Sequence, residues 1–131
     1  LQYILDYAAF ASDYTVILST EGDYFRETDY LADRLAPLGI GEEFENGGGI
    51  WIIENGQVTW KTNADTGDWY LEPDGVDIVM LRADGKGRIL VNQQDCTKVS
   101  DGINIVFYDK LLKNVVYSVG FAAGDGYTCV K

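Results

Sequence analysis

Two short apolar runs that meet across Asn55-Gly56 constrain the fold more than any other feature of this sequence. Ile50–Glu54 precedes the dipeptide and Gln57–Lys61 follows it. Both central positions of a two-residue hairpin turn need a positive φ angle, which Asn and Gly tolerate better than other residues. The segment is therefore predicted to form a β-hairpin.

The turn also predicts how the two strands pair. If residues are paired outward from the turn, Ile53 is predicted to face Val58 and Trp51 to face Trp60. The two tryptophans would then share one face of the hairpin. Two interpretations are open. The pair is either the core face of the hairpin or, together with Trp69, a platform on which sugar rings stack.

Further apolar runs predict a β-rich remainder. Two pairs of runs flank turn-forming segments and predict two more hairpins. One run near the N-terminus is continuously apolar and β-branched, which is typical of a strand buried on both faces. The paired runs are Val76–Leu81 with Arg88–Val91 and Gly102–Tyr108 with Val115–Phe121, the doubly buried run is Tyr14–Thr20, and a last short run is Tyr127–Val130.

Two helices are predicted ahead of these hairpins. Apolar residues recur at helical spacing over residues 1–10, and Thr28 can cap a second helix that Pro37 and Gly39 end. The predicted fold class is α+β. We expect a single domain in which two N-terminal helices pack on a mostly antiparallel mixed sheet built from three hairpins.

Length and charge restrict the function. A chain of 131 residues is the usual size of one domain. Its 21 acidic and 10 basic residues give a net charge of −11, which opposes binding to nucleic acid and to anionic membranes. A mimic of nucleic acid is formally compatible with this charge. No apolar stretch approaches the roughly 20 residues that cross a bilayer, so no membrane insertion is expected.

The absence of histidine restricts the chemistry further. It excludes Ser-His-Asp and Cys-His catalysis and histidine-ligated zinc. Three possibilities remain for a chain without histidine: catalysis by carboxylates, binding of a hard cation, or no chemistry at all. Asn63, Asp65, Asp68 and Asp74 do not fit the spacing of a calcium loop, and Gly47-Gly48-Gly49 precedes a strand instead of a helix, unlike a phosphate loop. We predict no metal, no cofactor and no catalytic residue; a glycosidase using two carboxylates is a minor alternative.

The two cysteines leave two readings open. Cys96 and Cys129 either form a disulfide that fastens the C-terminal segment or are two buried free thiols. The chain starts at Leu1 without a methionine or a basic leader, so we read it as an excised domain or a mature fragment.

Two regions resemble a known family. Tyr14–Asp23, the helix end Leu35–Gly39 and Gly49–Gly56 are similar to the strand, helix and strand of the interleukin-like EMT inducer domain, and Asp101–Asp109 with Asn114–Phe121 is similar to its two-stranded element, which here comes last. The bacterial form of this domain is appended to lipoteichoic-acid-synthase-like surface proteins. Another member is the carbohydrate-binding stem of a Golgi glycosyltransferase, whose acidic loop Glu21 and Asp23 match.

This resemblance and the aromatic residues together predict a function. We expect a non-catalytic, extracytoplasmic binding module of a bacterial surface protein that recognises carbohydrate or a cell-wall polymer. Glu21 and Asp23 would accept hydrogen bonds from hydroxyl groups, and Trp69 or the pair Trp51 and Trp60 would stack on sugar rings. The alternative is a structural or protein-interaction domain that contacts a neighbouring domain and binds no small ligand.

Overall fold

The computed structural model describes residues 13–22, 35–42, 48–122 and 128–130. The described chain is mostly β, with 60% of these residues in strands. Its elements are β1 (Tyr14–Glu21), η1 (Ala36–Leu38), β2 (Ile50–Glu54), β3 (Gln57–Thr62), β4 (Gly67–Leu71), η2 (Pro73–Gly75), β5 (Ile78–Ala83), β6 (Lys86–Val91), β7 (Gln94–Asp95), β8 (Gly102–Asp109), β9 (Asn114–Ala122) and β10 (Thr128–Val130).

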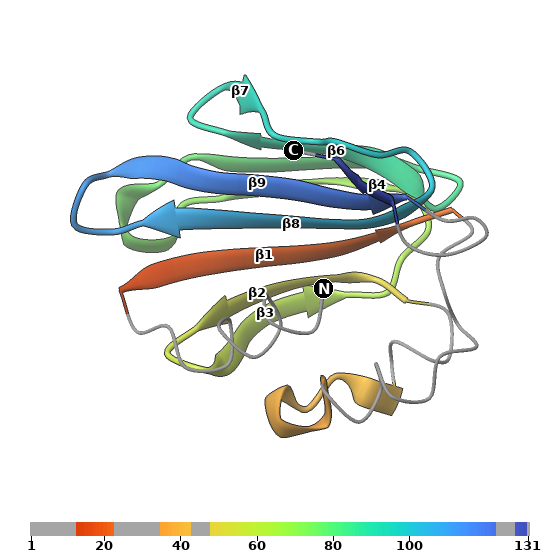
Figure 1. Ribbon diagram of the computed structural model, residues 1–131, viewed down its shortest axis with the longest axis horizontal. Helices are drawn as coiled ribbons and strands as arrows, with labels where there is room; N and C mark the ends of the chain where they lie inside the picture. The colour runs from red at the N-terminus through yellow and green to blue at the C-terminus, as the bar shows by residue number, and fades with distance from the viewer. Residues whose placement is uncertain (1–12, 23–34, 43–47, 123–127, 131) are drawn as a thin grey trace.

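The strands form two antiparallel sheets (Figure 1). The larger sheet has six strands in the order β10-β9-β8-β1-β2-β3, and the smaller has four in the order β4-β5-β6-β7. The predicted α+β class is therefore wrong. No helix of seven or more residues occurs in the described ranges, and β4 and β7 are strands that lie outside the predicted hairpins.

The two predicted helices fall mainly on residues whose structure is not described. The first, residues 1–10, lies entirely outside the described ranges, and so does most of the second. The described end of the second is the 3₁₀ turn η1, and Gly39 ends it in the left-handed region at φ 82°. Gly39 thus ends a single 3₁₀ turn, because glycine enters this region at little cost, whereas Pro37, which was expected to end a helix, lies in the first positions of that turn.

All three predicted hairpins are confirmed. β2 and β3 pair across Asn55-Gly56, β5 and β6 pair across Asp84-Gly85, and β8 pairs with β9. The residues of the first two turns have positive φ, as two-residue hairpin turns require.

The predicted pairing of two tryptophans is wrong. Ile53 does face Val58, but the register then shifts, so Trp60 faces Ile52 and Trp51 faces Lys61. The cause is a β-bulge at Thr59, which places one extra residue in β3. Because side chains alternate between faces, this single residue puts Trp51 and Trp60 on opposite faces of the sheet.

The six-stranded sheet is buried on both faces. β1 lies between β8 and β2 and carries buried residues from Thr15 to Glu21, as the run of apolar residues predicted. Leu18 faces one apolar cluster, which includes Leu35 and Trp51. Ile17 faces a second cluster between the sheets, which includes Met80 of β5. Only the second cluster joins the two sheets into a sandwich.

No helix within the described ranges is long and apolar enough to span a bilayer.

Burial on both faces leads to a stability prediction. Ile17→Ala and Leu18→Ala should each lower the free energy of unfolding by about 2–5 kcal/mol, because each leaves a cavity in a packed core. Leu111→Ala, at a side chain that is 77% exposed, is the control and should change it by less than about 0.5 kcal/mol. Chemical denaturation measures all three. A small effect of Leu18→Ala alone would contradict burial of the face that carries it.

Candidate functional site

Glu21, the first predicted ligand-binding residue, lies in a buried polar junction between the sheets. It ends β1 and is 2% exposed. Its Oε1 accepts a hydrogen bond of 2.7 Å from the Ser19 hydroxyl, and its Oε2 accepts one of 2.8 Å from the amide of Gly87 in β6. The carboxylate therefore connects the two sheets, and its oxygens are used inside the protein.

Arg82 of β5 extends this junction. It is a buried residue whose Nη2 donates to the carbonyl of Thr20 and, at 3.2 Å, to the carbonyl of Gly85. The amide of Gly22 donates to the same Gly85 carbonyl at 2.9 Å. The end of β1 is thus held against the β5–β6 turn by both side-chain and backbone bonds.

The junction shifts the acidity of Glu21. Burial raises the pKa of Glu21 above its ordinary value of 4.5, because a charged carboxylate loses solvation. The hydrogen bonds from Ser19 and Gly87 and the positive charge of Arg82 act in the opposite direction without cancelling this effect.

The three predicted tryptophans have separate surroundings. Trp51 is 1% exposed and belongs to the cluster on the far face of the large sheet. Trp60 and Trp69 are half-buried and pack against the cluster between the sheets. Their rings meet edge to face with centroids 6.1 Å apart. The structure thus brings together Trp60 and Trp69 instead of Trp51 and Trp60. Asp23, the remaining predicted ligand residue, lies outside the described residues.

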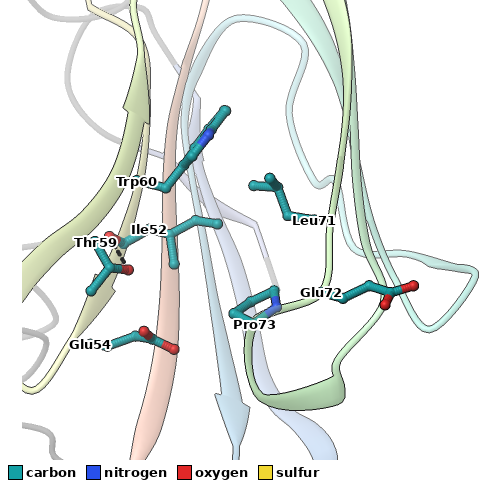
Figure 2. A pocket seen from close by; sticks show the side chains of 7 residues that line it. All are labelled: Ile52, Glu54, Thr59, Trp60, Leu71, Glu72 and Pro73. Carbon is teal, nitrogen blue, oxygen red and sulfur yellow. Dashed lines mark hydrogen bonds between the residues drawn. The ribbon is translucent and has the colours of Figure 1, made fainter.

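A groove opens beside Trp60, between the edge strands of the two sheets. Its volume is about 230 Å³. Ile52 and Trp60 of the large sheet lie on one side, and Leu71 and Pro73, at the end of β4 and beyond, lie on the other (Figure 2). Apolar side chains of the two sheets therefore face each other across an open space.

Polar groups border the same groove. The Glu54 side chain is 17% exposed, accepts a 3.3 Å hydrogen bond from the Thr15 hydroxyl and lies 4.0 Å from the Lys110 ammonium. Its carboxylate lies at the end of the groove, whereas that of Glu72 points away from it (Figure 2). The Thr59 hydroxyl, on the bulge, contacts the carbonyl of Ile52 at 3.5 Å. The groove thus combines an indole ring with a carboxylate and a hydroxyl.

Of the four predicted ligand-binding residues that the structure describes, only Trp60 lines this groove. Sequence reasoning missed Glu54, Thr59, Leu71, Glu72 and Pro73. Glu54 and Thr59 lie in the predicted hairpin, but nothing in their spacing indicates that Leu71 and Pro73 face them from the other sheet. The one feature of the sequence that could have indicated a groove residue was the position of Glu54 directly beside the hairpin turn.

Cys96 is a free thiol in the cluster between the sheets, which matches the second of the two readings for this residue. Burial raises its pKa. The side chain of Cys129 is outside the described part of the structure. Among the described residues, no three cysteine or acidic side chains converge to hold a metal ion.

The chain was compared with protein-family models, with curated proteins and with solved structures, and none of the three comparisons finds a match. Its similarity to the interleukin-like EMT inducer domain stays a prediction.

The junction predicts a pH dependence of stability. Because the folded-state pKa of Glu21 is raised, the folded protein holds this proton more tightly than the unfolded chain does. The contribution of Glu21 to stability is fully present below its ordinary pKa of 4.5 and is lost as the pH rises through the raised value. Relative to Glu21→Gln, which cannot titrate, the wild type should gain stability as the pH falls from neutral towards 4.5.

Urea unfolding of both proteins at a series of pH values measures this difference. The other carboxylates titrate in both proteins and cancel in the comparison. The wild type and Glu21→Gln are compared by the difference between their free energies of unfolding. If this difference stays constant with pH, or favours the variant more at low pH, a raised pKa at Glu21 is contradicted.

Proposed function

We propose that this protein is a non-catalytic binding module for carbohydrate or a cell-wall polymer, and that it acts outside the cytoplasm as part of a larger bacterial surface protein. The observation that carries the proposal is the groove between the sheet edges, where the Trp60 ring lies beside the Glu54 carboxylate and the Thr59 hydroxyl. Aromatic faces stack on the C–H face of a sugar, and carboxylate and hydroxyl groups bond its hydroxyls.

The size of the groove favours a small group. Its volume of about 230 Å³ is below the roughly 300–1,000 Å³ of pockets that enclose drug-sized ligands. One sugar ring of a longer chain fits this space better than a whole oligosaccharide does. An open groove at the edge of a sandwich also lets the polymer continue on both sides.

The charge of the protein favours neutral glycans. With a net charge of −11, the surface repels anionic polymers such as teichoic acids unless cations bridge the two. Calorimetry and tryptophan fluorescence against a panel of neutral and anionic wall polysaccharides test the proposal. Flat titrations across the whole panel would overturn it.

A pair of substitutions at Trp60 tests stacking. Trp60→Phe keeps a flat ring and should weaken glycan binding only a few-fold. Trp60→Leu stays apolar but removes the ring and should weaken glycan binding by about tenfold or more, in line with an aromatic contact worth about 1.5 kcal/mol. Calorimetry measures both affinities, and thermal unfolding confirms that both variants are folded. Equal affinities of the two variants would contradict stacking on Trp60.

A second pair of substitutions tests the carboxylate. Glu54→Gln should lower affinity by about tenfold, because a hydrogen bond to a charged acceptor contributes about 1.5–3 kcal/mol. Glu72→Gln is the matched control at the same groove, and it should have little effect since the Glu72 carboxylate points away. A glycan-affinity measurement on both variants decides the point. Similar losses for both would indicate general electrostatics instead of a direct contact by Glu54.

One observation favours the alternative, a protein-interaction domain. The outer face of the four-stranded sheet carries apolar side chains, among them Tyr70 at 70% exposed, and surface patches of this kind often mark protein contacts.

A further inference from the structure

Both faces of the four-stranded sheet carry apolar side chains. One contains Trp69, Ile78, Met80, Ile89 and Val91 and packs in the cluster between the sheets. Side chains alternate along each strand, so the intervening residues point to the other side. On that outer face Tyr70 is exposed and three aliphatic residues are half-buried, namely Val79, Leu81 and Leu90.

Strand register arranges these outer residues in two rows. In the first, Tyr70 of β4 faces Val79 of β5, Val79 faces Leu90 of β6, and the exposed Asp95 of β7 ends the row beside Leu90. The neighbouring row is formed in the same way by Asp68, Leu81 and Arg88. An acid on β4 and a base on β6 therefore flank a leucine on the middle strand, and both charged residues are exposed.

This arrangement is self-complementary. Consider a two-fold axis that runs parallel to β5 above the outer face. It places β4 of one copy over β6 of the other, and each row of one copy lies over the same row of the other. Asp68 of each copy then lies over Arg88 of the other, and Tyr70 over Leu90. Val79 and Leu81, on the middle strand, each meet the same residue of the other copy. Two-fold contacts of this kind use one surface twice.

We propose that the outer face of the four-stranded sheet binds a second copy of this chain through this two-fold contact. The register supplies the argument for this occupant: opposite charges meet twice, and every apolar residue of the face meets an apolar partner. Face-to-face packing of two sheets is a common arrangement in β proteins, with the sheets about 10 Å apart.

The contact is small. The three strands that overlap, β4, β5 and β6, are about 4.8 Å apart, and about five residues of each cover roughly 250 Å² in the sheet plane, compared with about 800 Å² per partner in stable complexes. The net charge of −11 on each copy also opposes association. We therefore expect a weak dimer that forms at high protein concentration and at ionic strengths that screen this repulsion.

Sedimentation equilibrium from about 10 μM to about 1 mM protein, in buffer of physiological ionic strength, tests the dimer. Arg88→Asp and Asp68→Arg should each weaken self-association by about tenfold or more, because each places two pairs of like charges in contact. Lys98→Asp, which makes the same charge change at an exposed residue away from this face, is the control and should leave self-association nearly unchanged.

Two further measurements use the symmetry itself. The double variant Asp68→Arg/Arg88→Asp exchanges the two charges and should recover the self-association of the wild type. A mixture of the two single variants should form a heterodimer more readily than either variant self-associates, because both of its charge pairs are opposite. A wild type that stays monomeric throughout the range, or a mixture no more associated than its components, would overturn the proposal.

Discussion

The buried contact between Glu21 and Gly87 is a directional bond between the two sheets, at the junction where Arg82 and Gly22 also join them. Apolar packing between sheets is non-directional, and by itself it allows one sheet to slide over the other. A carboxylate at the end of β1 that accepts the β6 amide, beside the Arg82 guanidinium, fixes one corner of the sandwich. The groove lies between strands of different sheets, so its width depends on this alignment.

The same contact gives Glu21 a role different from the predicted one. Its position after a buried strand, in a loop resembling that of a sugar-binding stem, indicated a ligand contact. Both of its oxygens are instead bonded within the protein. Sequence shows that an acid follows a strand, but it does not show whether a second sheet covers that acid.

Local signals predicted the hairpins correctly because their cause is local. Asn55-Gly56 needs nothing beyond its own backbone preferences to form a turn, and the run from Tyr14 to Thr20 indicates burial wherever the strand lies. The pairing of Trp51 with Trp60 failed at one residue, since neither composition nor alternation reveals that β3 has an extra residue at Thr59. Trp60 was among the predicted binding residues, but the groove itself could not be predicted, because Trp60 and Leu71 meet only after two sheets have packed.

The two proposals concern different parts of the sandwich. The groove uses the edges of both sheets, whereas the proposed dimer uses the outer face of the smaller one. β4 contributes to both, with Leu71 in the groove and Tyr70 on the outer face. Adjacent residues of one strand thus serve different surfaces, which lets substitutions separate glycan binding from self-association.

The bulge at Thr59 has an evolutionary consequence. In a regular hairpin Trp60 would lie across from Trp51, within the core on the far face of the large sheet. With one more residue in the strand, the same tryptophan lies in the groove, and no side chain needs to be replaced. Gain or loss of a single codon at such a position can therefore move an aromatic residue between the interior and the surface, a shorter mutational path than building a surface aromatic anew.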